Sequence, residues 1–426
     1  MGHKRHAITP ERAVPTQSGS AAQTPLRPRR IDSIDVLRAI ALTGMVLCHF
    51  TVYYSSPVGA GAWIHFVMNH TLGDLGAGTF LALMGISQVL SAEQERSAGG
   101  TNLTRKALIR AGYIVVVGLI MIAVVWGPRE LWQWDILTLM GTATLVLFAV
   151  RRWNSLWVIA LIVLIIAATP SLRAGLDFAR VWGAELAPVQ PFSAYVPGLY
   201  YDPPGDPKIF WTLRDIVQGY LFVGEFPVMP WLAFPLVGLV LGRRVVSRRM
   251  IADTPAITAL GAALFVTGFS IAFAARGEPA SAAIRGYLAP LSFYPDSFTM
   301  TLVQMGFVLW LFPLVYRGMD RSDRPAREPG AWIRYCRRLS RYSLTVYFMH
   351  YVLLAWPLWI GYLASGEFLI QKAMSPLPAF ACGVFALMVL HRLMLWLDRK
   401  QGIFSLEWCL AMLVLRFARE PTGMPN

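Results

Sequence analysis

Long apolar stretches recur along this chain of 426 residues and constrain its fold more than any other feature. They lie near residues 36–54, 74–92, 109–126, 134–150, 155–170, 226–242, 256–275, 298–316, 342–364 and 377–397. As a helix, about 20 such residues cross the roughly 30 Å hydrocarbon core of a bilayer. The chain is 56% hydrophobic and 15% charged, whereas soluble domains carry about 25% charge. The sequence therefore predicts an all-α, polytopic transmembrane bundle of about ten helices.

The positions of the basic residues predict the topology, because Lys and Arg are retained on the cytoplasmic side of a membrane. With the N-terminus inside, the inner segments hold 29 of the 38 Lys and Arg, the outer segments hold 8, and Arg38 lies within the first helix. Both termini are thus predicted to be cytosolic. We expect a multi-pass protein of a bacterial inner membrane, in contact with lipid. This topology explains the net charge of +14 without a nucleic acid partner.

One membrane domain is predicted over residues 35–416, between two cytosolic tails. Residues 1–34 lack the apolar core of a secretory signal and have the composition of a disordered, basic tail, and residues 417–426 form the second tail. The outer loop 171–225 is long enough to cover an outward-facing site. The inner loop 317–341 is strongly basic, which suits anionic phosphates as well as simple retention inside. The four cysteines are widely spaced, so we expect neither a disulfide framework nor a metal site.

The first apolar stretch carries ionisable residues, which are costly at membrane depth. Arg38 and His49 are 11 residues apart, so they share one helix face roughly 16 Å from each other. Asp35 lies one turn before Arg38 on nearly the same face. This face therefore offers a carboxylate and a guanidinium near the cytosol and an imidazole in the outer half of the membrane. The alternative is that Asp35 and Arg38 anchor the helix at the interface and that His49 only packs.

A second group of polar residues lies at the start of the next apolar stretch. His65 and His70 precede Asp74 in a predicted outer loop, and the short connection allows them to approach His49. An imidazole beside a carboxylate is the usual arrangement of a general base. The alternative for Asp74 is stabilisation of a helix N-terminus by its carboxylate.

Other polar residues allow two interpretations each. Asp135, Glu225 and Asp296 also stand near predicted helix starts, where capping explains them. His350 lies near the middle of the ninth stretch, where it is either a buried, hydrogen-bonded histidine or part of a site. None of them identifies a site without further contacts.

Several motifs resemble known membrane proteins. The segment IDVLRAIALTGMVLCHF is similar to the opening of membrane-bound acyltransferases in which an Arg, ten residues and a His recur, and Arg38 and His49 fit this spacing. The pieces DLGAGTFLALMGIS, WDILTLMGTATL and EFPVMPWLAFPLVGLVLGRR resemble, in order, the heparan-alpha-glucosaminide N-acetyltransferase catalytic-domain family. The later segments YSLTVYFMHYVLL and GIFSLEW look like the C-terminal part of related bacterial membrane proteins, so the resemblance extends over nearly the whole chain from about residue 31.

The resemblance implies an acyltransferase that uses cytosolic acetyl-CoA and acts on a sugar amine or hydroxyl on the far side of the membrane. We expect Arg38 and Asp35 near the phosphates of the donor, and His49 as general base or as the group that takes the acyl chain. Asp74 would orient that imidazole. In the glucosaminide enzymes the active histidine lies in the loop before the Asp that Asp74 matches, which makes His65 the second candidate. A carbohydrate or glycolipid is the expected acceptor.

Two other functions are compatible with the same residues. In a transporter or flippase of a glycan- or lipid-linked substrate, the intramembrane His and Arg would line the substrate path. In a non-catalytic membrane partner, they would serve helix packing. The acyl-transfer hypothesis is preferred because the resemblance favours it.

Overall fold

Each of the ten predicted apolar stretches forms a helix in the computed structural model, which describes residues 30–57, 61–97, 99, 102–176, 181, 187–188, 199, 201–202, 211–276, 286–320 and 329–418. The α-helices are α1 (Asp32–Tyr54), α2 (Ala62–Val67), α3 (Asp74–Ser97), α4 (Leu103–Val125), α5 (Ile136–Val150), α6 (Ser155–Arg173), α8 (Leu213–Gln218), α9 (Val228–Trp231), α10 (Ala233–Val246), α11 (Met250–Ala275), α12 (Phe298–Met319), α13 (Ala331–Arg341), α14 (Ser343–Ser365), α15 (Pro376–Arg399) and α16 (Leu406–Phe417). The remaining elements are the π-helices η1 (Met68–Gly73) and η4 (Gly219–Val223), the 3-10 helix η2 (Pro128–Glu130), and the two-residue antiparallel strands β1 (Ala187–Pro188) and β2 (Tyr201–Asp202).

Nine helical segments in the described part of the chain are long and apolar enough to cross a membrane. The tenth apolar helix, α5, has 15 residues. The prediction of an all-α, polytopic transmembrane bundle is thus confirmed. The predicted tails fall largely outside the described residues, at 1–29 and 419–426, and so does much of the predicted outer loop 171–225.

Two helices occupy segments that lack a long apolar stretch. The predicted inner loop 317–341 ends in α13, whose sequence AWIRYCRRLSR is too short and too basic to cross a membrane. Its buried face, with Cys336 and Leu339, packs against α1 and α15. α16 follows α15 and contacts α4 and α14. The remainder of the inner loop, 321–328, lies outside the described residues.

The second membrane segment differs from its prediction in where it begins. The helix does not start at Asp74, because α2, η1 and α3 follow one another without a break from Ala62 to Ser97. His65 and His70 therefore lie in helical turns rather than in a loop. The capping alternative for Asp74 fails for the same reason, since the preceding turns already occupy the backbone N–H groups that a cap would bind.

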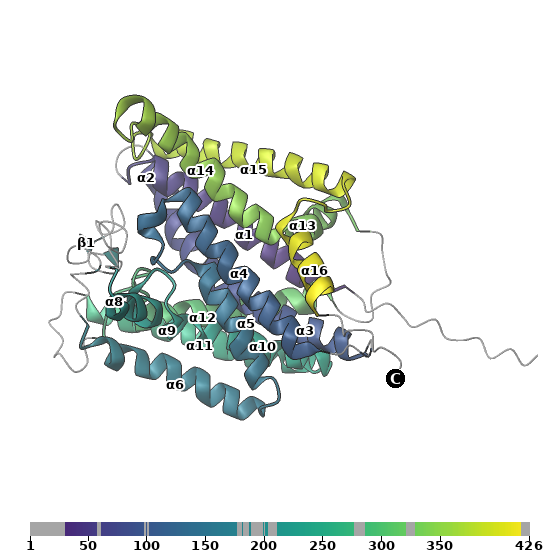
Figure 1. The fold of residues 1–426 in the computed structure, drawn as a ribbon. Helices are drawn as coiled ribbons and strands as arrows, with labels where there is room; N and C mark the ends of the chain where they lie inside the picture. The colour runs from purple at the N-terminus through teal and green to yellow at the C-terminus, as the bar shows by residue number, and fades with distance from the viewer. Residues whose placement is uncertain are drawn as a thin grey trace, which may run out of the picture. The chain divides into compact units, whose positions relative to one another are not determined.

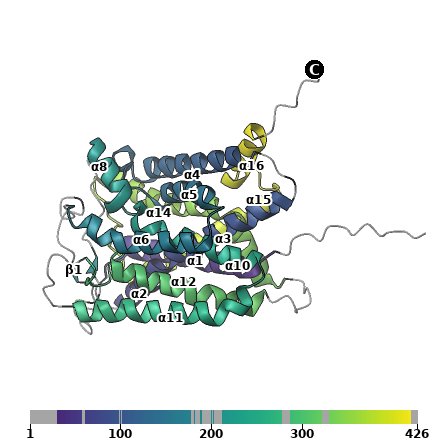
Figure 2. The same cartoon turned by 90° about the horizontal axis from the view of Figure 1, so that it is seen from below.

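α1 occupies a central position in the bundle. It contacts α3, η1, α13, α14 and α15, and Figures 1 and 2 show it among the other helices rather than at the edge. Half of its most apolar window is buried, a larger fraction than in α6 or α11. On its ionisable face, Asp35 is buried and Arg38 and His49 are partly buried.

Close contact between α3 and α10 fixes the position of α3, which packs beside α1. A Cβ atom at Gly85 would lie 2.2 Å from the carbonyl oxygen of Pro235, and one at Gly238 would lie 2.0 Å from that of Ala82. Only glycine permits this approach. Small residues at helix crossings are the usual means of packing in membranes, because they let backbones approach closely.

Candidate functional site

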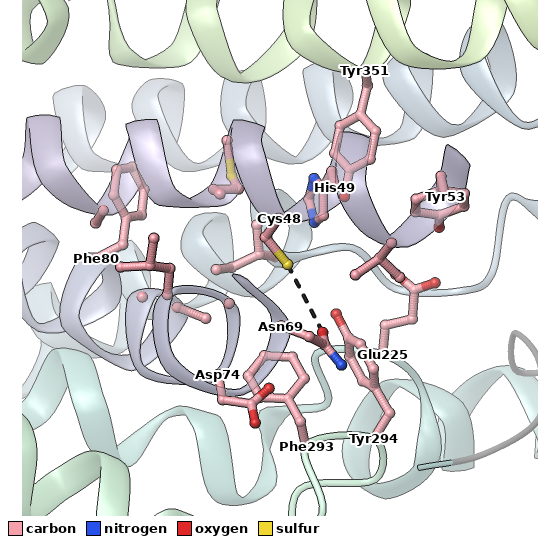
Figure 3. Close-up of a pocket in the computed structure, with 18 of the residues that line it drawn as sticks. Cys48, His49, Tyr53, Asn69, Asp74, Phe80, Glu225, Phe293, Tyr294 and Tyr351 are labelled. Atoms are coloured by element: carbon pink, nitrogen blue, oxygen red, sulfur yellow. Dashed lines mark hydrogen bonds between the residues drawn. The ribbon is translucent and has the colours of Figure 1, made fainter. Parts of the chain in front are cut away.

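A cavity of about 330 Å³ runs along α1. The α1 residues that line it are Ala41, Leu42, Met45, Cys48, His49, Val52 and Tyr53, whose spacing of three and four residues is that of one helix face. This face covers about 18 Å of helix. Figure 3 shows His49 and Cys48 near its centre and Tyr53 toward one end. Of the ionisable residues predicted to share one face of the first helix, His49 lines the cavity.

The opposite wall comes from η1 and α3. Asn69, Leu72 and Gly73 of η1 and Asp74, Ala77 and Phe80 of α3 line the cavity. π-helical turns inside longer helices are frequent at functional sites. Here the turn carries the amide of Asn69, whose Oδ1 lies 3.8 Å from Sγ of Cys48. A Cβ atom at Gly73 would lie 2.8 Å from the same sulfur, so a larger residue there would displace the Cys48 side chain.

The end of the cavity beside Tyr53 is polar. Glu225 and Tyr294 line it, together with Gln371 and Lys372 of the segment between α14 and α15. Burial and the nearby Glu225 carboxylate raise the pKa of the Tyr294 hydroxyl well above its usual value. The backbone N–H of Lys372 donates to the carbonyl of Tyr53 at 3.0 Å, which fixes this segment to the end of α1. The opposite end, beside Ala41, Met45 and Phe80, is apolar.

His49 pairs with a second histidine. Its Nδ1 lies 3.0 Å from Nε2 of His350 on α14, and the two ring planes are 18° apart. Nδ1 of His350 is hydrogen-bonded to the backbone carbonyl of Tyr347. His350 is completely buried, whereas His49 contributes to the cavity wall.

An aromatic shell and a buried carboxylate hold this pair. The ring centroid of Tyr351 lies 5.0 Å from the ring centroid of His49 and 4.1 Å from that of His350. The hydroxyl of Tyr347 donates to Oδ2 of Asp135 at 2.6 Å. Oδ1 of Asp135 accepts from the backbone N–H of Leu137 at 2.8 Å, so the predicted capping role of Asp135 is confirmed.

The other two carboxylates predicted to cap helices do not do so. α12 is capped by Ser297, and Asp296 instead accepts from the hydroxyl of Thr301 at 2.6 Å. Glu225 precedes α9 by three residues and lines the cavity.

Asp74 has a histidine neighbour, as predicted, and it is His70. Nδ1 of His70 lies 3.0 Å from Oδ2 of Asp74, one helical turn away, and both side chains are buried. Asp74 lines the cavity, but neither His70 nor His65 does. His65 is buried on α2, and its Nδ1 has no hydrogen-bond partner among the described residues.

Arg38 and Asp35 lie on α1 before the first cavity residue. Arg38 is one turn from Ala41, and its guanidinium donates to the hydroxyls of Ser87 at 2.6 Å and Ser340 at 2.8 Å. These bonds join α1 to α3 and α13. Asp35 is buried, and neither residue lines the cavity.

Within the described ranges, no three His, Cys, Asp or Glu side chains gather closely enough to hold a metal ion. The polar groups that line the cavity, among them His49, Asp74 and Glu225, are suited to proton transfer and hydrogen bonding. Sequence reasoning left His350 open and overlooked Tyr347 and Tyr351, although all three lie within YSLTVYFMHY. The signal available was their spacing at three and four residues, which places Tyr347, His350 and Tyr351 on one helix face.

Residues 30–273 match a protein-family model described as heparan-alpha-glucosaminide N-acetyltransferase, catalytic. The matched segment carries His49, Asp74 and Glu225 and ends before α14. A comparison with curated proteins gives no significant match.

Proposed function

Because the chain belongs to the heparan-alpha-glucosaminide N-acetyltransferase catalytic-domain family, as its motifs predicted, we propose that it moves an acetyl group from acetyl-CoA to a sugar amine or hydroxyl. The donor enters from the cytosol and the acceptor from the opposite face of the membrane. The family supports a membrane acetyltransferase, and the chain is a multi-pass membrane protein.

The observation that carries the proposal is that His49 lies on the cavity wall within the family segment, with Asp74 on the same cavity. An imidazole is the usual general base near neutral pH. The apolar end of the cavity suits the arm of the thioester donor, and the polar end with Glu225 and Lys372 suits a hydroxylated acceptor. His49 thus lies between an apolar region suited to the donor and a polar region suited to the acceptor.

The proposed reaction transfers one acyl group. The acceptor nitrogen or oxygen attacks the thioester carbonyl carbon, its proton moves to His49, and the carbon–sulfur bond breaks. The departing thiolate then takes the proton from His49, so that the products are the acetylated acceptor and CoA thiol. Asp74 supports this step by holding the η1 and α3 wall through His70.

Arg38 is proposed to lie near the donor phosphates. It stands one turn beyond the apolar end of the cavity and is not fully buried. Its bonds to Ser87 and Ser340 are to neutral hydroxyls, which are weaker partners for a guanidinium than phosphate oxygens. Asp35, one turn further, would orient it.

The test is acetyl transfer by purified protein from radiolabelled acetyl-CoA to a panel containing a glucosamine-terminated saccharide, a neutral polysaccharide and a lipid headgroup. The wild type should label at least one acceptor. His49→Ala should lower the rate by about 10²-fold or more, without changing the thermal unfolding temperature by more than a few degrees. A fully active His49→Ala protein would remove His49 from the mechanism. Uptake of an unmodified acceptor into proteoliposomes without acetyl-CoA would instead indicate a transporter.

A further inference from the structure

His350, which pairs with His49, takes no part in the proposed proton transfer. We propose that His350 is a positioning residue that fixes the tautomer of His49, so that Nε2 of His49 presents its lone pair to the cavity. This inference rests on the proposed function for its catalytic consequence. Its structural content, the position of one hydrogen on His49, is independent of that function.

The chain of hydrogen bonds begins at a group that can only accept. The backbone carbonyl of Tyr347 accepts from Nδ1 of His350, so Nδ1 of His350 carries the hydrogen. In a neutral imidazole the other nitrogen then has a lone pair, and Nε2 of His350 must accept. The group facing it at 3.0 Å is Nδ1 of His49, which therefore donates. The hydrogen of a neutral His49 is on Nδ1, and its lone pair is on Nε2.

Burial favours the neutral form of both histidines. His350 is completely buried, and an uncompensated charge is unfavourable in such surroundings. The groups that contact the pair include the rings of Tyr351, Tyr347 and Tyr53 and the backbone carbonyl of Tyr347, all of them uncharged as neutral tyrosines. The carboxylate of Asp135 is engaged by the Tyr347 hydroxyl and by the N–H of Leu137.

The arrangement also suits His49 after it has taken a proton. The resulting imidazolium donates from both nitrogens, and Nε2 of His350 still accepts from Nδ1 without any rearrangement. A preformed acceptor of this kind lowers the barrier because no group must reorient during the reaction. His350 thus has the role that a buried carboxylate has beside the histidine of a serine-protease triad, but it is neutral.

The position of the carbonyl is itself fixed by neighbouring helices. The side chain of Tyr347 is bound to Asp135, which caps α5. Separately from these contacts, the hydroxyl of Tyr54 on α1 donates to the carbonyl of Leu354 on α14 at 2.8 Å, one turn beyond the pair. His350 lies outside the family segment 30–273, and the site is therefore completed by α14.

Two amide substitutions separate positioning from packing. A glutamine side chain reaches the place of Nε2 of His350, where its carbonyl oxygen can accept from His49. An asparagine reaches only the place of Nδ1, where it can bind the Tyr347 carbonyl but leaves His49 without an acceptor. His350→Asn should lower kcat for acetyl transfer by about 10²-fold and change the KM for acetyl-CoA by less than about threefold. His350→Gln should retain kcat within about tenfold of the wild type.

Tyr54→Phe is the matched control. It removes a buried hydrogen bond between the same two helices, α1 and α14, but this bond does not involve His49, His350 or the Tyr347 carbonyl. It should retain wild-type kcat. Equal kcat values for His350→Asn and His350→Gln would overturn the inference, and so would a loss of kcat in Tyr54→Phe as large as that in His350→Asn.

The tautomer can be measured without any reaction. Nitrogen-15 NMR of histidine-labelled protein in lipid bilayers, with the His49 signals assigned through His49→Gln, distinguishes a protonated from an unprotonated ring nitrogen. We expect the hydrogen on Nδ1 of His49 in the wild type and in His350→Gln, and a shift toward Nε2 in His350→Asn. A wild-type hydrogen on Nε2 would overturn the inference. Wild-type protein that transfers no acetyl group would overturn the proposed function alone, since the NMR result still decides the tautomer.

Discussion

Nδ1 of His70 lies 3.0 Å from Oδ2 of Asp74, and these side chains are only 2% and 4% exposed. Removing one member of such a buried pair leaves the other without its partner, which costs about 1–3 kcal/mol. We therefore expect Asp74→Ala and His70→Gln each to lower the free energy of unfolding by about this amount. The double variant should lose less than the sum, with a coupling of about 0.5–3 kcal/mol. Denaturant titration of the four proteins in detergent measures this coupling, and strict additivity would contradict it.

The two candidate histidines of the acyl-transfer hypothesis differ in their access to the cavity. His49 lines it, and His65 does not. His65→Gln should therefore retain acetyl transfer within about threefold, while His49→Gln loses about 10²-fold or more. Initial rates with labelled acetyl-CoA compare the two variants. A larger loss in His65→Gln than in His49→Gln would make His65 the catalytic histidine.

Tyr347 contributes its hydroxyl to stability and its carbonyl to the histidine pair. Tyr347→Phe removes the 2.6 Å bond to Asp135 but retains the backbone carbonyl. We expect a loss of about 1–3 kcal/mol in the free energy of unfolding, because a buried carboxylate oxygen loses its donor. The control is Tyr362→Phe on the same helix, whose side chain is 39% exposed. Equal unfolding free energies for the two variants would show that the Asp135 bond contributes nothing.

Features that depend on local sequence could be predicted, whereas features that depend on distant partners could not. The apolar stretches predicted the membrane helices because length and composition are local, and the 3.6-residue repeat predicted that Arg38 and His49 share one helix face. The pairing of His49 with His350 joins residues 301 positions apart, for which no periodicity gives a signal. His70 rather than His65 meets Asp74 because the helix continues upstream through η1, and a π turn has no clear sequence signature.

Arg38 offers a test of donor binding. Arg38→Lys keeps the charge but loses the planar fork that binds phosphate oxygens. We expect the KM for acetyl-CoA to rise by about tenfold, which corresponds to about 1.4 kcal/mol, while kcat changes little. Arg129→Lys is the control, since Arg129 is exposed and lies outside the predicted inner segments. An unchanged KM combined with a lower unfolding temperature would show that Arg38 only joins α1 to α3 and α13.

Asp296 makes the stability of the protein depend on pH. It lies in the segment before α12, and burial raises its pKa to about 8, against the opposing effects of the Thr301 hydroxyl and Arg173. Between the unfolded value of 3.8 and about 8, the folded protein therefore holds a proton that the unfolded chain has released. Since stability falls with rising pH wherever the folded state binds more protons, the contribution of Asp296 becomes unfavourable from about pH 4 upward and levels off above about pH 8.

Asp296→Asn should remove this dependence, because the amide does not titrate. Between about pH 5 and pH 8, which lies below the folded-state pKa of about 8, the unfolding temperature of the variant should rise relative to that of the wild type. Thermal unfolding at several pH values measures it, with Glu367→Gln in the exposed α14–α15 segment as the control. Taking the difference removes the contributions of the other titrating groups, which both proteins share. A difference that stays constant across this range, or moves toward the wild type, would show that Asp296 is ionised in the folded protein.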